Sequence, residues 1–290
     1  MILGGNRLPV IENIKKNILN NELNKKVEID DPVLTQEEIM KVIDKFYKNK
    51  KNKLIYSIRN RRAKNTLNSV YFKEKKRIKL EGLNNIKKLN LNNGAIITCN
   101  HFNQLDSFCA KKLADKLNKK LYMVIEDTNL MLPGSLGFLM NYLDVIPINK
   151  SPNYISHVFL PELKKILDAG HLVLIYPEEE MWFNYRKPRP CKRGAYQFAS
   201  QLNVPIISCF VEMIDTNYKN TDDFNYVNCI VHILKPIIPD KNKSDRCNSI
   251  HMANIDYIQK KEAYRKAYGK KLDYTFDYSD IAGLVKKTNS

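Results

Sequence analysis

The sequence lacks the long apolar segments that membranes and secretion require. The 290-residue chain has no run of about 18 or more apolar residues, which is the shortest stretch read as a transmembrane helix. Its first residues, MILGGNRLPVIENIKK, contain no continuous apolar stretch of the kind found in secretory signal peptides. We therefore expect a chain that neither spans a membrane by itself nor carries a secretory signal peptide.

Clusters of cysteine and histidine are also missing. The six cysteines are spread along the chain, with no CxxC pair and no Cys/His group at the spacing of metal ligands. This pattern excludes the common zinc modules. It indicates reduced thiols in a cytosolic compartment, several of them buried in strands.

Acidic residues are few compared with basic ones. The chain has 48 Lys and Arg against 31 Asp and Glu, a formal net charge of +17 and a pI near 9.4. Apolar residues make up 43% and charged residues 27%, as in globular proteins. The charge favours an anionic partner: nucleic acid, a phospholipid surface or a small molecule that carries phosphate. No helix-turn-helix, zinc module or RNP-like motif supports the first of these, so we expect no nucleic-acid partner.

Residues 1–75 are rich in Lys and Asn and carry apolar residues at helical spacing. Thr35 and Glu38 form a capping box ahead of one such helix. The stretch KNKKNK at 48–53 is interpreted as a solvated linker before a second, basic helix. We interpret the whole segment as an N-terminal basic helical extension.

Short apolar runs alternate with helical stretches over residues 76–240, the predicted core. This alternation predicts an α/β fold with a mostly parallel central sheet flanked by helices. Residues 241–290 are expected to form a C-terminal helix and a tail that pack on the core. In such sheets functional groups gather just beyond the carboxyl ends of the strands. The predicted strands span 94–99, 120–126, 143–148, 171–176, 204–214 and 228–237, and the predicted helices span 105–118, 153–168 and 193–202.

The segment TCNHFNQLDSF at 98–108 follows the first of these apolar runs and holds His101 five positions before Asp106. On an ideal helix five residues separate two side chains by about 140°, so the pair can meet only if the chain turns between them. Asn103 suits such a turn. A carboxylate that orients a histidine makes it a general base for a hydroxyl. Taken alone, this spacing has a chance of very roughly a quarter of arising by coincidence.

Three further segments follow this one in a characteristic order. NHFNQLD at 100–106 is followed by LDVIPINK at 143–150, YPEEEMW at 176–182 and VPIISC at 204–209. This set resembles the phospholipid/glycerol acyltransferase family, including the 1-acylglycerol-3-phosphate acyltransferases. The family pattern runs NHxxxxD, a strand that ends in an arginine, FPEGTRS and VPIIPV. The resemblance covers about residues 76–236 and implies the glycerol-phosphate acyltransferase-like fold.

The resemblance also implies a reaction. A fatty acyl group would move from acyl-CoA or acyl-carrier protein to a hydroxyl of a glycerol-phosphate or lysophospholipid-type acceptor. His101 is expected to act as general base, oriented by Asp106. The acyl thioester is a co-substrate, and we expect no further cofactor and no metal. Substrate-binding roles are expected for Asn100, Pro177 and Glu178.

Departures from the family pattern lie where an acceptor phosphate would bind. Lys150 replaces the arginine of the second block, keeping its charge but losing the bidentate fork. Residues 179–182 replace the Gly-Thr-Arg-Ser of the third block. Arg186 and Arg189 follow and are expected to offer positive charge to the acceptor from another direction. We expect the loop MWFNYRKPRP at 181–190 to form an acceptor lid or a membrane contact.

A lipid substrate requires that the chain reach a bilayer. The segment LIYSIRNRRAKNTLNSVYFKEKK at 54–76 supplies basic and aromatic side chains for peripheral contact with an anionic membrane, and its alternative interpretation is a solvated basic helix. We expect a cytoplasmic protein at the inner face of the cell membrane. Two alternatives stay open: acylation of a glycolipid or cell-wall glycan hydroxyl, and a basic nucleic-acid-binding protein.

Overall fold

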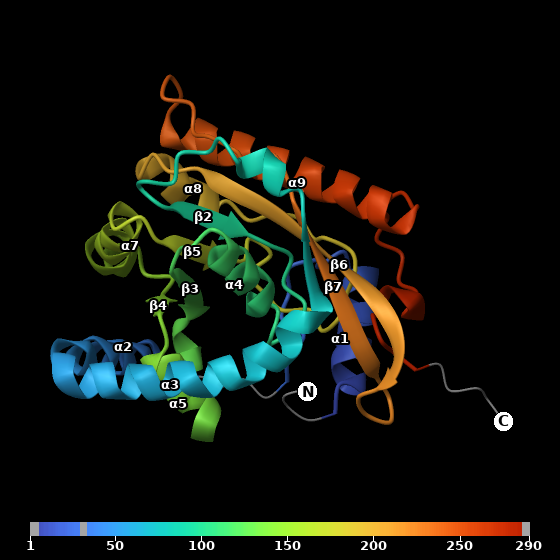
Figure 1. Ribbon diagram of the computed structural model, residues 1–290, viewed down its shortest axis with the longest axis horizontal. Coiled ribbons are helices and arrows are strands. Elements are labelled where there is room, and N and C mark those ends of the chain that lie inside the picture. Colours follow the sequence, from blue (N-terminus) through green and yellow to red (C-terminus); the bar gives the residue numbers. More distant parts are fainter. Residues whose placement is uncertain (1–5, 30–33, 286–290) are drawn as a thin grey trace.

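A mostly parallel sheet forms the centre of the molecule (Figure 1). The computed structural model describes residues 6–29 and 34–285, and seven strands lie within these residues in the order β1-β7-β6-β2-β5-β3-β4. Every neighbouring pair is parallel except β6 and β7. The predicted fold class is therefore confirmed. The strands are β1 Ile78–Glu81, β2 Ala95–Thr98, β3 Leu121–Glu126, β4 Val145–Ile148, β5 Leu172–Ile175, β6 Ile206–Lys219 and β7 Asn225–Ile233.

The strand directions define one edge of the sheet as the place to look for a site. Strands β2, β3, β4 and β5 run parallel to one another and to β6, whereas β7 and β1 run the opposite way. The carboxyl ends of the first group therefore share an edge with the amino ends of β1 and β7. Functional side chains are expected at such an edge.

Helices cover both faces of this sheet, and two helices from the N-terminal part of the chain, α2 and α3, lie beyond it (Figure 1). Helices α2 and α3 lie side by side, and α3 packs on α5. Helix α9 runs along α8 and β6. The helices are α1 Leu8–Leu19, α2 Gln36–Lys51, α3 Lys53–Glu74, α4 Ser107–Lys116, α5 Gly134–Tyr142, α6 Pro152–Tyr154, α7 Leu160–Asp168, α8 Gly194–Gln201 and α9 Asp245–Tyr268. The boundaries proposed at residues 75 and 240 stay predictions.

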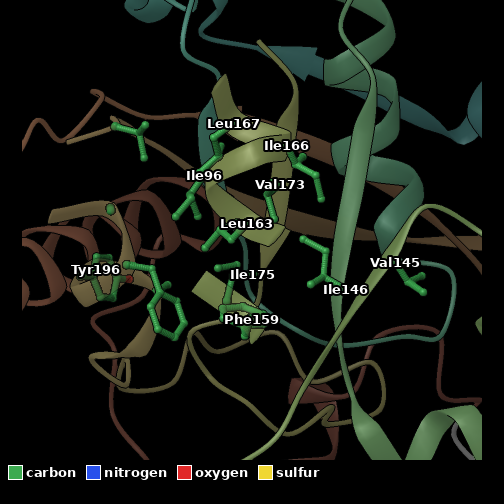
Figure 2. Packing of buried hydrophobic residues seen from close by; sticks show 14 of the residues in the cluster. Ile96, Val145, Ile146, Phe159, Leu163, Ile166, Leu167, Val173, Ile175 and Tyr196 are labelled. Carbon is green, nitrogen blue, oxygen red and sulfur yellow. The ribbon is translucent and has the colours of Figure 1, made fainter. Parts of the chain in front are cut away.

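The central strands are buried on both faces, so their residues alternate between two cores. Ile96 and Val173 pack with α7 and α8 on one face, as Figure 2 shows. Ile97 and Leu174 pack with α4 on the other. Complete burial of such a side chain contributes about 1.5–3 kcal/mol relative to its exposure. The continuous apolar runs in the sequence follow from this double burial.

Strand β2 begins at a turn that only glycine fits. Gly94 has a φ of 65°, and a Cβ atom there would lie 2.2 Å from the carbonyl oxygen of His171. A larger residue would therefore displace the start of β2. This matters because β2 leads directly into the segment that holds His101.

Helices α2 and α3 correct one prediction and confirm another. The linker predicted at 48–53 is wrong, because only Asn52 separates the two helices. Phe46 is buried in the last part of α2, and Lys50 lies over its ring at 4.7 Å. Tertiary packing therefore holds Lys- and Asn-rich sequence in helix. The capping box is confirmed: the backbone N–H of Glu38 donates to the Thr35 hydroxyl at 3.3 Å, and the Thr35 N–H donates to the Glu38 carboxylate at 2.8 Å.

The helix predicted at 153–168 is present but not uniform. A π-helical turn at Ile155–Phe159 joins α6 to α7. Pro161 lies at the start of α7 and has no backbone N–H to donate to the preceding turn. A change of helical pitch before the proline accommodates this missing hydrogen bond.

Candidate active site

His101 and Asp106 form a hydrogen-bonded pair just beyond the carboxyl end of β2. The His101 Nδ1 atom lies 2.8 Å from the Asp106 Oδ2 atom. The chain turns between the two residues, and the Asp106 N–H donates to the Asn103 carbonyl at 3.1 Å to close this turn. The turn brings together two side chains that a continuous helix would hold apart. The same Oδ2 atom accepts the backbone N–H groups of Phe102 at 2.9 Å and Asn103 at 3.2 Å. The carboxylate is therefore fixed by the loop that it closes.

The protonation of the histidine follows from its partner. An ionised carboxylate only accepts hydrogen bonds, so the proton of the neutral imidazole is on Nδ1. The Nε2 atom then carries the free lone pair, and it has no hydrogen-bond partner among the described residues. The His101 side chain is 20% exposed, whereas that of Asp106 is 3% exposed. This arrangement can accept a proton from a hydroxyl group that approaches from solvent.

Asn100 fixes the position of this loop on the sheet. Its side-chain Nδ2 donates to the Val211 carbonyl at 3.1 Å, and its Oδ1 accepts the Val211 N–H at 2.7 Å. Asn100 is 2% exposed, and both ends of its amide point into β6. The structure therefore shows Asn100 supporting the loop, with both ends of its side-chain amide bonded within the protein.

Glu178 is buried behind His101 in a second pair. Its carboxylate accepts the backbone N–H of His101 at 3.2 Å and that of Arg189 at 2.9 Å. The Arg189 guanidinium lies 2.9 Å from the same carboxylate, and both side chains are almost completely buried. Burial lowers the pKa of Arg189, and the Glu178 charge opposes that shift. Pro177 is buried beside them, with its carbonyl bonded to the Lys192 N–H at 2.7 Å. These residues shape the loop and do not face solvent.

A cleft opens beside the dyad, between the start of α4, the end of α3 and the amino ends of β1 and β7. Asp106 and Asn103 belong to its lining. Arg77 also lines it, stacked at 3.9 Å over the Tyr226 ring and paired with Glu74 at 3.1 Å. Apolar side chains make up much of the remaining surface. They are Ile78, Phe102, Leu105, Phe108 and Val227.

Comparison with known proteins identifies the family to which this core belongs. Residues 77–212 match the family model described as Acyltransferase. This segment belongs to the acyltransferase family. A comparison with curated proteins gave no match. Among solved structures, the chain is similar to the 1-acyl-sn-glycerophosphate (LPA) acyltransferase PlsC from Thermotoga maritima, with 15% identity, a TM-score of 0.44, and coverage of 80% of this chain and 89% of that one.

The cations expected to bind an acceptor phosphate lie apart. Lys150 is exposed just after β4 and has no hydrogen bond or ion pair to another described residue. Arg186 is buried, 2.5 Å from the Asp215 carboxylate, and also donates to the carbonyls of Met213 and Ser279. Like Arg189, it is occupied within the protein. The expected substrate contacts of these two arginines are therefore not supported by their placement.

The aromatic loop at 181–190 is buried, so the predicted lid or membrane contact is wrong. Trp182 and Phe183 have no exposed surface and Tyr185 is 2% exposed. They pack against α1 and Ile281 in a core of their own. The basic residues in this loop are typical of a surface segment, but in the structure their side chains are buried and form ion pairs within the protein.

Tyr176 is a residue that the motif comparison did not single out. It follows β5, and its ring stacks on the His101 imidazole with centroids 3.8 Å apart and planes 9° apart. Its hydroxyl donates to the Asp106 Oδ1 atom at 2.5 Å. The sequence held a signal, because YPE stands where the family pattern has FPE. Tyr176 differs from the phenylalanine of the family pattern by the hydroxyl group that contacts Asp106.

The buried thiols near the dyad are poor nucleophiles. A hydrogen bond with Cys209, together with burial, raises the pKa of Cys99 well above its ordinary value. Contact with Cys229 and burial raise the pKa of Cys109 in the same way. Both thiols are therefore protonated at neutral pH, and reactivity requires the thiolate.

Neither a metal cluster nor a membrane span occurs in the part of the chain that the structure describes. No group of three or more His, Cys, Asp or Glu side chains within residues 6–29 and 34–285 is arranged to hold a metal ion. No helix among these residues is both long enough and apolar enough to cross a bilayer.

Proposed function

We propose that the protein moves a fatty acyl group from an acyl thioester to a hydroxyl of a glycerol-phosphate or lysophospholipid-type acceptor. The observation that carries this proposal is the 2.8 Å hydrogen bond between His101 and Asp106 at the carboxyl edge of the sheet. This hydrogen bond occupies Nδ1, so that Nε2, which has no partner among the described residues, can act as the base. The acyltransferase family of residues 77–212 supports acyl transfer as the type of reaction.

The reaction needs one base and no covalent intermediate on the protein. His101 Nε2 takes the proton of the acceptor hydroxyl as the hydroxyl oxygen attacks the thioester carbonyl. Asp106 stabilises the imidazolium that forms. When the tetrahedral intermediate collapses, the carbon–sulfur bond breaks, and the departing thiolate of CoA or of the carrier protein takes the proton from Nε2 and leaves as the thiol. General base catalysis of this kind contributes about 10²–10⁴-fold in rate.

The cleft beside Asp106 supports an amphiphilic substrate. Its apolar lining suits an acyl chain, because burial of each methylene group contributes about 0.8 kcal/mol. Arg77 places a guanidinium at the same cleft, and a guanidinium suits a phosphate group. We therefore favour an acceptor with both an acyl chain and a phosphate over a glycolipid or a glycan.

An acyl-transfer assay tests this function. Acyl-CoA and acyl-carrier protein are offered as donors, with lysophospholipid, glycerol phosphate and glycolipid as acceptors. Transfer to a phosphate-bearing acceptor is expected. His101→Ala is expected to lower kcat by at least about 100-fold, whereas His157→Ala, at an exposed position on the π-helical turn, leaves it unchanged. A wild-type protein that acylates none of these acceptors, or an H101A variant as active as wild type, contradicts the proposal.

We also propose that the protein meets its lipid substrate by docking peripherally on an anionic membrane. Three apolar side chains on α3 are exposed to solvent, Leu54 by 74%, Ile55 by 46% and Ile58 by 63%; we name them the α3 apolar patch. Lys and Arg surround the patch, and no acidic residue occurs between Asp44 and Glu74. Each basic residue near an anionic surface contributes about 1 kcal/mol, and apolar side chains can insert below the headgroups.

Flotation with vesicles tests this docking. We expect binding to vesicles that contain phosphatidylserine, weaker binding at high salt and little binding to neutral vesicles, because salt screens the attraction. Binding that depends on neither anionic lipid nor salt contradicts the proposed mode. The loop at 181–190 takes no part in it, since its aromatic side chains are buried.

A further inference from the structure

Tyr176 contacts both members of the dyad from the neighbouring strand. β5 pairs with β2, so the residue that follows β5 lies beside the loop that follows β2. One face of the Tyr176 ring lies on the His101 imidazole at 3.8 Å, and the Tyr176 hydroxyl reaches Asp106 at 2.5 Å. The same side chain therefore limits the rotation of the imidazole and of the carboxylate.

The two oxygens of the Asp106 carboxylate have different partners. The Oδ2 atom accepts from His101 and from two backbone N–H groups of the loop. Among the described residues, the Oδ1 atom accepts only from Tyr176. Without that hydroxyl, the buried Oδ1 atom would lose its hydrogen bond and the carboxylate would lose one of the contacts that fix its plane.

We propose that Tyr176 is a positioning residue for the His101–Asp106 base. Its ring holds the imidazole in the plane that presents Nε2, and its hydroxyl holds the carboxylate and withdraws part of its negative charge from Nδ1. This proposal rests on the proposed acyl transfer and adds a third member to its base. A phenylalanine, as in the family pattern FPEGTRS, would supply the stacking alone.

The hydroxyl of Tyr176 remains a donor throughout the working pH range. Burial, with the negative charge of Asp106, raises the pKa of Tyr176 well above its ordinary value. Its acceptor is a carboxylate, and charge-assisted hydrogen bonds of this kind are about twice as strong as neutral ones.

Asp106 is the charged group in direct contact with the His101 ring, at 2.8 Å. Glu178 lies behind the His101 backbone, but Arg189 neutralises it at 2.9 Å. The thiols of Cys99 and Cys109 on the neighbouring elements are neutral, because their pKa values are raised. A change in the charge that Asp106 presents to Nδ1 is therefore expected to appear directly in the titration of His101.

Tyr176→Phe isolates the hydroxyl, because the ring remains. Removal of the donor leaves more negative charge on Asp106 and stabilises the imidazolium. We expect the titration midpoint of the His101 ring resonance, followed by NMR in the full-length protein, to rise by roughly half to one pH unit. The chain has five histidines, and the signal missing from His101→Ala identifies the right one.

Tyr71→Phe is the matched control. Tyr71 is also buried and donates to a carboxylate, that of Asp115, at 2.7 Å. It therefore loses the same kind of hydrogen bond at a carboxylate outside the dyad. We expect no change in the His101 midpoint. A Tyr176→Phe midpoint within about 0.2 pH units of wild type, or an equal rise in both variants, overturns the proposal.

Kinetics supply a second readout. For Tyr176→Phe we expect kcat to fall by roughly threefold to tenfold, a fraction of the contribution of a general base. The acidic limb of the pH profile should rise with the NMR midpoint, and KM should change by less than about twofold because the hydroxyl faces Asp106. An effect on KM alone overturns the positioning role. If the wild type transfers no acyl group, the proposed function fails, and the NMR midpoints still decide whether Tyr176 governs the dyad.

Discussion

The buried pair of Glu178 and Arg189 leads to the sharpest prediction about stability. Both side chains have 2% or less of their surface exposed, and their charged atoms are 2.9 Å apart. Arg189→Met keeps most of the side-chain length and removes the charge. Glu178 then remains buried with only the backbone N–H groups of His101 and residue 189 as donors.

The size of the effect follows from this geometry. Breaking a buried pair by removing one partner destabilises a protein by about 3–5 kcal/mol, because the other charge stays uncompensated. Arg189 also donates to the carbonyls of Leu23 and Glu180 and stacks at 4.5 Å over Trp182, which places the expected loss in the upper half of that range. For a chain of this size, the melting temperature should fall by on the order of 10 °C.

Urea unfolding provides the measurement. Trp182 is the single tryptophan of the chain and contacts Arg189, so its fluorescence reports on the pair while circular dichroism reports on the whole fold. Arg265→Met serves as control, since Arg265 forms an exposed pair with Glu262 at 2.7 Å. Such surface pairs contribute little to stability, because solvent screens them, so this variant should unfold close to wild type.

Two results would refute the reasoning. The first is an Arg189→Met variant that unfolds within about 1 kcal/mol of wild type. The second is a variant of unchanged stability whose KM for a phosphate-bearing acceptor rises, which would return Arg189 to substrate binding. Adding Glu178→Gln to Arg189→Met should recover part of the lost stability, because the buried charge is then absent.

Two further predictions concern the surface. Replacing the α3 apolar patch with serine should weaken binding to anionic vesicles by at least about tenfold, from lost apolar burial, while Ile258→Ser on the distant α9 leaves flotation unchanged. Hydrogen bonds from Thr275 lower the pKa of Asp273 to about 2. The ionised form therefore stabilises the fold above the ordinary pKa near 3.8, and that contribution disappears as the pH falls from about 4 towards 2. Asp273→Asn should destabilise the protein at pH 7, and the difference in urea midpoint should shrink below pH 4; a difference independent of pH contradicts this cause.

The sequence was informative where burial imposes a simple pattern. Strands such as β2 and β5 are apolar throughout because the sheet is covered on both faces. The capping box at Thr35 is local, and it was predicted correctly for that reason. The family blocks also located the loop of His101 and Asp106. Their roles in catalysis stay predictions, although the structure brings the two side chains into contact.

The errors arose where a charged side chain is paired and buried by contacts that its sequence neighbours do not reveal. Arg186 and Arg189 resemble free cations in a basic loop, but their carboxylate partners are Asp215 and Glu178. The aromatic residues among them are buried by α1, which lies more than 150 residues earlier in the chain. The supposed linker at 48–53 is helical because Phe46 and neighbouring residues pack on the core.

By itself, the sequence determined the α/β alternation, the strand ends and the order of the acyltransferase blocks, because these depend on periodicity and short-range spacing. Only the tertiary structure decided which charges are neutralised inside the protein and which face a cleft. It also placed the Tyr176 hydroxyl on Asp106, 70 positions away in the chain. The physical reason is that hydrogen bonds and ion pairs depend on distances in space, and adjacent parallel strands bring together residues that the sequence keeps far apart.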